Sequence, residues 1–272
     1  MQGTHMKKVL APYKWLTERP SYMFLTASDD RLEAQDPGRF TDAWLGLMGL
    51  ALLTGLTLIG LWSVVWRLFH DWDRLSRPAG ITAIFVLAWP MRMALASIGP
   101  AFRLRSRGNQ FALAAAAAAL VGVGFMSLAE RYPSAYEYAM PDWIAWIVWV
   151  RPELSIFRVL LLMPIWGAWS MLIAGQFRPP NGITDAATRR FIRGCGPLAA
   201  AACMAIPMAG TIVYFHYMGV VGQVAVTAGT VLTAIASGPI LCAIGGGLTR
   251  QALLAASLIT QIVFLMLCTI WL

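Results

Sequence analysis

Seven apolar stretches follow one another along most of this chain, and each is about as long as a lipid bilayer is thick. A hydrocarbon core of about 30 Å is crossed by roughly 20 apolar residues in an α-helix. Lipid offers no water to backbone N–H and C=O groups, so crossing segments form helices. The sequence therefore predicts an all-α, polytopic transmembrane bundle of about seven spans. The expected spans are 43–66, 79–98, 110–129, 154–176, 195–215, 219–241 and 252–272.

The composition agrees with a membrane protein and argues against nucleic-acid binding. Hydrophobic residues make up 58% of the chain and charged residues only 12%, against about 25% charged residues in soluble domains. The net charge of +8 comes mainly from arginines in the connecting loops, where it sets topology. The cysteines show no metal-binding or disulfide spacing, and we expect small buried residues and no cofactor. They are Cys195, Cys203, Cys242 and Cys268.

Three regions are expected along the chain. Residues 1–6 resemble a cloning remnant that precedes a second methionine. Residues 7–42 mix acidic and basic side chains, are too short for a good core of their own, and are expected to form a cytoplasmic arm. Residues 43–272 form the transmembrane helical domain.

Loop charges predict which side of the membrane each connection occupies. Loops 99–109 and 177–194 are rich in arginine, whereas loop 130–153 is acidic. Cytoplasmic loops carry an excess of Lys and Arg, so we expect loops 99–109, 177–194 and 245–251 inside, with the N-terminus. The location predicted is a cell membrane, as in a bacterial inner membrane. The connection between spans 195–215 and 219–241, at residues 216–219, is the shortest. If it is not a turn between two spans, the number of spans falls to six.

Small residues and prolines suggest how the spans pack. The six alanines of 114–119 let helix backbones approach closely, which places span 110–129 in the middle of the bundle. The face of Gly229, Thr233 and Ser237 repeats every four residues and can pack tightly or hydrogen-bond to a neighbouring helix. Four spans contain a proline that removes one backbone hydrogen bond and kinks its helix. These prolines are Pro90, Pro164, Pro207 and Pro239.

Polar residues within or beside the spans are the candidate ligand-binding residues. Arg92 follows Pro90, which leaves backbone carbonyls one turn earlier without a donor. The Arg92 guanidinium can bind these carbonyls or an anionic substrate. Arg158 lies one turn into its span, and both arginines have the alternative of snorkelling to the interface. His216 and His70 are both expected near the outer ends of their spans, so they share a face. Together they can ligate haem or a metal or handle a proton, and the alternative is that they are interfacial polar residues.

One short acidic cluster is a candidate metal site. His70, Asp71 and Asp73 lie at a predicted membrane boundary, and carboxylates there can hold a divalent cation for work on a phosphorylated lipid. The alternative is a solvated helix end.

The cytoplasmic arginines are candidates for contacts with phosphates or lipid headgroups. The same residues already suffice to fix topology, so partner binding is an additional hypothesis. They are Arg103, Arg105, Arg107, Arg189, Arg190 and Arg193.

No Asp or Glu lies inside any expected span, which argues against a carboxylate proton relay. We interpret the chain as a permease-like protein or an accessory membrane subunit of a transport assembly, without redox chemistry. Its expected partners are membrane lipids and other membrane subunits. The alternatives are a membrane-embedded enzyme that acts on a phosphorylated lipid and a purely structural membrane subunit.

Overall fold

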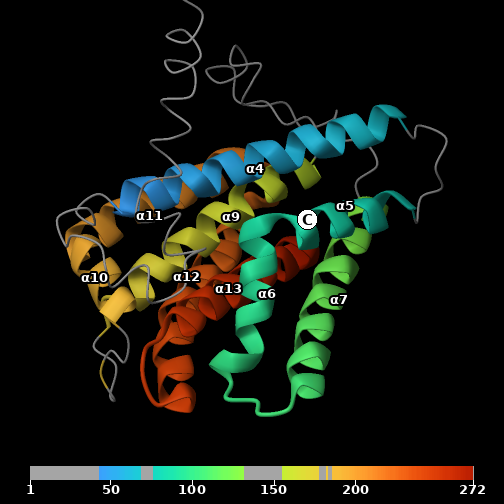
Figure 1. The fold of residues 1–272 in the computed structure, drawn as a ribbon. Coiled ribbons are helices and arrows are strands. Elements are labelled where there is room, and N and C mark those ends of the chain that lie inside the picture. The colour runs from blue at the N-terminus through green and yellow to red at the C-terminus, as the bar shows by residue number, and fades with distance from the viewer. Residues whose placement is uncertain (1–42, 69–75, 132–154, 178–181, 183–185, 272) are drawn as a thin grey trace, which may run out of the picture.

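The computed structural model describes residues 43–68, 76–131, 155–177, 182 and 186–271 (Figure 1). These residues form helices and contain no strand, which confirms the all-α fold class. Six of the helices are long and apolar enough to cross a membrane: α4, α7, α9, α11, α12 and α13. The elements are α4 (Ala43–Leu68), α5 (Ser76–Leu87), α6 (Trp89–Ala101), α7 (Arg107–Arg131), α9 (Ser155–Ala174), α10 (Ala186–Gly194), α11 (Pro197–Tyr214), the 3₁₀ turn η4 (His216–Met218), α12 (Gly219–Gly245) and α13 (Arg250–Trp271).

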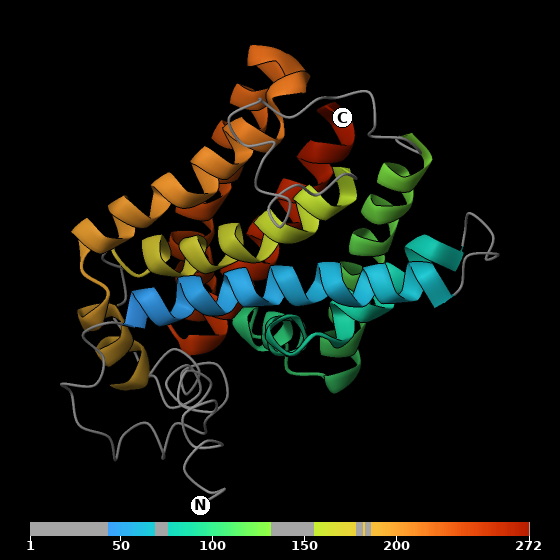
Figure 2. The same ribbon diagram turned by 90° about the horizontal axis from the view of Figure 1, so that it is seen from above.

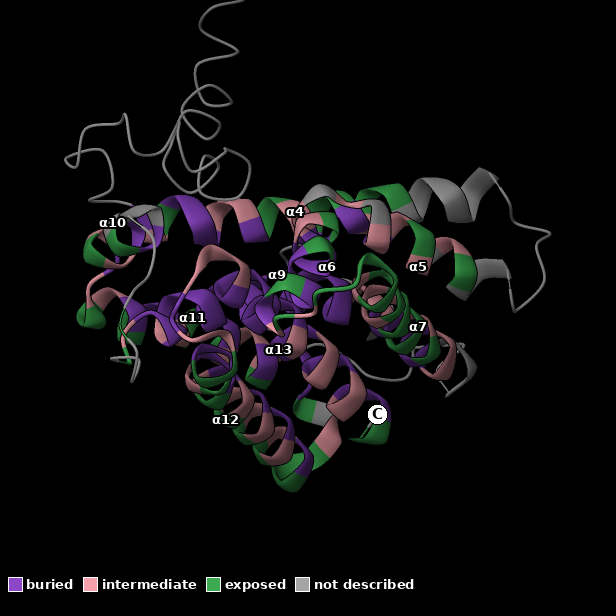
Figure 3. Ribbon diagram, turned by 60° about the horizontal axis from the view of Figure 1, so that its bottom comes forward, coloured by how far each residue is buried: buried purple, intermediate pink, exposed green. Residues whose placement is uncertain are grey.

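The helices form two groups that cross each other. Helices α4, α9 and α11 run alongside one another, and α12 and α13 pack against α9 from below, with α6 and α7 packed against α13 (Figures 1 and 2). Burial is concentrated on α9 and α13, where the two groups meet (Figure 3). These two helices therefore form the centre of the bundle.

The prediction that span 110–129 is central is wrong. Helix α7, which contains this span, is 28% buried, whereas α9 is 89% buried. Ala115, Ala116 and Ala119 of the alanine run are exposed, because alanine lets helices approach closely but gains little by burial.

Helix α9 occupies the centre because it carries two large aromatic side chains whose polar atoms are satisfied there. Trp166 and Trp169 are 0% and 1% exposed. The Trp166 indole N–H donates to Oγ1 of Thr211 at 3.1 Å, and that of Trp169 donates to the Ala200 carbonyl at 2.9 Å. A buried indole needs such an acceptor, so α11 is fixed against α9 by these bonds.

The small-residue face of α12 packs as predicted at one position. A Cβ added at Gly229 would lie 2.7 Å from Cδ1 of Leu267 on α13. The hydroxyls bond within α12 instead of to a neighbour: Thr233 donates to the Gly229 carbonyl at 2.8 Å and Ser237 to that of Ala234 at 3.2 Å.

The short break at 216–219 is present. Helix α11 ends at Tyr214, the 3₁₀ turn η4 follows, and α12 begins at Gly219, whose φ of 72° is one that glycine adopts without strain. The expected span 195–215 corresponds to α11, which is preceded by the separate helix α10 and starts at Pro197 in its first turn.

The three arginine-bearing loops meet, as their predicted common side requires. The Arg103 guanidinium Nε donates to the Gly245 carbonyl at 2.9 Å, which joins the α6–α7 loop to the end of α12. The Leu248 N–H donates to the Gly182 carbonyl at 3.1 Å, which joins the α12–α13 loop to the segment before α10. Loops 99–109, 177–194 and 245–251 therefore lie on one side of the bundle, while the choice of the cytoplasm as that side stays a prediction.

The four cysteines are free and buried, as expected for small apolar residues. Cys195 lies between α10 and α11, where burial, with a smaller contribution from Cys203, raises the pKa of its thiol to about 12. This thiol is therefore protonated at neutral pH and a poor nucleophile.

Gly55 on α4 is expected to be intolerant of a side chain. A Cβ there would lie 2.8 Å from the Leu161 carbonyl oxygen and 3.0 Å from its Cα, and the backbone of α9 cannot turn aside as a side chain can. We expect Gly55→Ala to lower the free energy of unfolding by about 1–3 kcal/mol. Unfolding in mixed detergent micelles, followed by tryptophan fluorescence, measures this.

Gly60, one and a half turns further along α4, is the matched control. An added Cβ meets no atom within 4 Å there, so Gly60→Ala should raise the stability by about 0.5–1 kcal/mol. Equal effects of the two substitutions would contradict the close contact between α4 and α9.

Candidate functional site

The segment expected as one kinked span, 79–98, is instead two helices. Helix α5 has 12 residues and ends at Leu87, and α6 has 13 residues and begins at Trp89. Ala88 between them has φ −55° and ψ 129°, which is not helical. Pro90 lies in the first turn of α6 and has no N–H to donate to the Val86 carbonyl. The proline therefore starts a new helix instead of kinking a continuous one, whereas Pro164, Pro207 and Pro239 lie inside helices.

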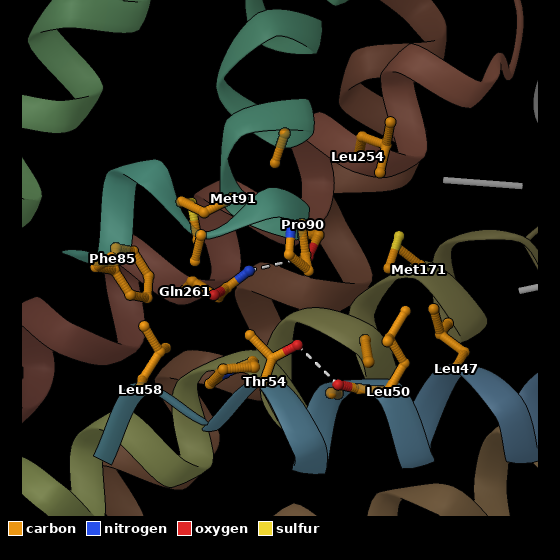
Figure 4. Close-up of a pocket in the computed structure, with 16 residues that line it drawn as sticks. Leu47, Leu50, Thr54, Leu58, Phe85, Pro90, Met91, Met171, Leu254 and Gln261 are labelled. Carbon is orange, nitrogen blue, oxygen red and sulfur yellow. Dashed lines mark hydrogen bonds between the residues drawn. The ribbon is translucent and has the colours of Figure 1, made fainter. Parts of the chain in front are cut away.

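A pocket lies directly beside this break. Its walls come from α4, α5, α6, α9 and α13, and both Ala88 and Pro90 line it (Figure 4). Pro164 of α9 lines it too, so prolines of two different helices, α6 and α9, line the same pocket. The space between the lining atoms, counted together with the open side of the pocket, is about 490 Å³.

The lining is apolar apart from three uncharged polar side chains. Leu58, Phe85 and Met91 are typical of the walls, and the polar residues are Thr54, Ser257 and Gln261. None of the lining residues is ionisable. A bound ion would therefore lose its water without gaining an opposite charge, which is costly.

Gln261 on α13 carries the most informative polar atom of the pocket. Its side chain is 5% exposed, and its Nε2 donates to Oγ of Ser257 at 3.1 Å. Its Oε1 is buried and has no hydrogen-bond partner among the described residues. A buried polar atom without a partner costs about 1–3 kcal/mol, so this oxygen is suited to receive a donor from a ligand or water.

Two neighbours set the position of Gln261. Gly167 of α9 leaves room for the pair, because a Cβ added there would lie 2.6 Å from the Ser257 Oγ and would also collide with the amide of Gln261. Thr54 reaches the pocket from α4, opposite α13 (Figure 4). Its hydroxyl donates to the Leu50 carbonyl at 2.7 Å, which leaves the oxygen of Thr54 as an acceptor.

The structure does not bring the predicted ligand-binding residues into this pocket. Arg92 is exposed on α6, although Met91 and Ala94 on the same helix line the pocket. His216 is exposed in η4, with its Nδ1 3.1 Å from the Val213 carbonyl oxygen. Ligand binding by these residues stays a prediction that the pocket does not support.

Arg158 requires a correction, because it is not a snorkelling side chain. It is 2% exposed and its Nη1 donates to the Tyr214 carbonyl at 2.7 Å. Tyr214 is the last residue of α11, and the carbonyls at a helix C-terminus have no partners within the helix and attract positive charge. Arg158 therefore holds the end of α11 against α9.

The predicted phosphate or headgroup contacts stay predictions. Arg105, Arg107, Arg189 and Arg193 are exposed. Arg103 is exposed too, but its Nε is bonded to Gly245. The side chain of Arg190 lies outside the described residues.

The predicted metal residues His70, Asp71 and Asp73 also lie outside the described residues, as do the N-terminal remnant and arm. Among the residues that the structure describes, no group of three or more His, Cys, Asp or Glu side chains is placed to hold a metal.

Sequence reasoning missed the polar residues of the pocket because it searched the spans for charge. The signal available was a pair of hydrogen-bonding residues four apart, Ser257 and Gln261, inside the apolar run 252–272. Residues four apart share a helix face.

Fold and pocket together define a multi-pass integral membrane protein with a small apolar cavity at a broken helix. A scan against protein-family models and searches of curated proteins and of solved structures find no match to this chain.

Proposed function

We propose that the protein is permease-like and carries a small uncharged solute through the pocket between α4, α6, α9 and α13. The observation that carries this proposal is the break between α5 and α6 at the edge of the pocket. Transporters commonly form their substrate sites from interrupted helices. Non-helical backbone at membrane depth is tolerated where protein or a cavity surrounds it.

The break also allows α5 and α6 to move relative to each other. Residue 88 is the only non-helical residue between α5 and α6, so changes in its two dihedral angles swing one helix relative to the other. Hinges in proteins are a few residues at element ends that absorb such changes. Ala88 lines the pocket, so its rotation alters the shape of the binding space directly.

The lining selects for an uncharged solute. It contains no ionisable side chain, and the buried guanidinium of Arg158 is engaged with the Tyr214 carbonyl. An unpaired ion in this environment would cost several kcal/mol. Uncharged solutes with a few hydrogen-bonding groups avoid that cost.

Filling the pocket tests the proposal. Ala94 on α6 lines the pocket and is 2% exposed, so we expect Ala94→Trp to abolish solute flux because the indole occupies the solute's space. Purified protein in liposomes, with a panel of short polyols, acetamide and urea, gives the flux by stopped-flow light scattering. The smaller Ala94→Leu should lower the flux partially.

Ala96→Trp is the matched control, because Ala96 is exposed on the same helix. It should retain wild-type flux. If the wild-type protein moves no solute of the panel faster than protein-free liposomes do, the permease proposal is wrong. Equal flux through wild-type protein and a folded Ala94→Leu variant would show that the pocket is not on the path.

A further inference from the structure

We propose that the solute is a short aliphatic diol, bound by one hydroxyl to Gln261 and Ser257 and by the other to Thr54. This inference rests on the proposed function and names the chemical class that the same pocket takes.

The wall formed by α13 offers one acceptor and one donor. The acceptor is the Gln261 Oε1, which has no partner among the described residues. The Ser257 oxygen accepts from the Gln261 Nε2 at 3.1 Å, and its own hydrogen has no acceptor in the part of the chain that the structure describes. A hydroxyl both donates and accepts, so a single alcohol group can satisfy both.

The same ligand fits either orientation of the Gln261 amide. Carboxamide oxygen and nitrogen exchange places when the group is turned over. Oε1 would then accept from the Ser257 hydroxyl, and Nε2 would face the ligand as a donor. In both orientations the wall presents one donor and one acceptor, so a hydroxyl satisfies both groups, whereas a carbonyl leaves the acceptor without a partner and an ammonium leaves the donor without one.

The opposite wall offers a second acceptor. The Thr54 hydroxyl donates to the Leu50 carbonyl, so its oxygen can only accept from a ligand. Apart from Thr54, Ser257 and Gln261 the lining is apolar, as at Leu58, Phe85 and Met91 (Figure 4). Two polar positions on opposite walls of an otherwise apolar pocket match an aliphatic molecule that carries two hydroxyls.

Flux of 1,2-propanediol into proteoliposomes tests this inference. Gln261→Met keeps the length of the side chain and removes its polar atoms, and we expect flux about tenfold lower, equal to one lost hydrogen bond to a buried group. Gln251→Met on the same helix lies outside the pocket and should leave flux unchanged. Thr54→Val, which keeps the shape and removes the hydroxyl, should lower flux several-fold.

Thermal unfolding followed by tryptophan fluorescence identifies variants that do not fold. If Gln261→Met does not fold, the flux of Thr54→Val tests the diol assignment alone.

Propanediol flux that is unchanged in folded Gln261→Met or in folded Thr54→Val overturns the diol assignment. So does a wild-type protein that carries acetamide or urea but not propanediol, in which case the permease proposal stands. If no panel solute is carried, the permease proposal falls. In that case, protection of a Thr54→Cys thiol from a methanethiosulfonate reagent by propanediol supports the diol site, and absence of protection overturns it.

Discussion

Arg158→Ala is expected to lower the free energy of unfolding by about 3 kcal/mol. The substitution removes a charge-assisted hydrogen bond of 2.7 Å to the Tyr214 carbonyl. It also leaves a cavity, because the side chain is 2% exposed. The end of α11 would lose the positive charge that lies against its last carbonyls. Unfolding in mixed micelles, followed by tryptophan fluorescence, gives the change.

Arg92→Ala provides the control for this experiment. Arg92 is exposed on α6, so its removal should change the stability by less than about 0.5 kcal/mol. Arg158→Lys should recover part of the loss, because an ammonium group donates to a carbonyl but lacks the planar fork of a guanidinium. A stability of Arg158→Ala close to that of the wild-type protein would show that the contact with Tyr214 contributes little.

The sequence predicted the helices well because lipid imposes one rule on every crossing segment. The six long helices cover six of the seven expected apolar stretches, and the break before Gly219 was recognisable from a glycine and polar residues. Loop arginines predicted which loops share a side, and the bonds of Arg103 to Gly245 and of Leu248 to Gly182 join those loops. Both inferences depend on composition within a segment and not on its neighbours.

The neighbours of each helix could not be predicted in the same way. In water an apolar stripe marks the buried face of a helix, but in a bilayer the lipid-facing residues are apolar too. Helices α7 and α9 therefore each contain an apolar segment long enough to span a membrane, although that segment is 28% buried in α7 and 89% buried in α9. The alanine run of α7 led to the prediction of a central helix. Small side chains allow a helix to contact a neighbour closely, but they do not require other helices to surround it.

The same limit explains the errors at individual residues. Arg158 lies near a span end in the sequence, and snorkelling is the ordinary behaviour there. Its burial depends on the C-terminus of α11, which is 56 residues further along the chain. Gln261 is uncharged and gave no signal when charge was the criterion, yet the fold leaves its Oε1 without a partner.

Gly167→Ala is expected to reduce propanediol flux about tenfold, as for the loss of one hydrogen bond, with little change in stability. The added Cβ would lie 2.6 Å from the Ser257 Oγ and 2.7 Å from the Gln261 Cδ. These atoms end side chains that can rotate, so we expect Gln261 to turn away while α9 and α13 stay in contact. Flux falls because the amide no longer faces the ligand, although no residue of the pocket has been replaced.

Gly122→Ala on α7 is the matched control, because its added Cβ would lie 3.4 Å from Cγ2 of Thr82, an ordinary contact. It should retain wild-type flux and stability. A second substitution separates position from chemistry: if Gly167→Ala acts by displacing Gln261, adding it to Gln261→Met should lower flux no further. Additive losses would mean that Gly167 acts on the pocket by another route, and full flux in Gly167→Ala would mean that the orientation of Gln261 does not matter for passage.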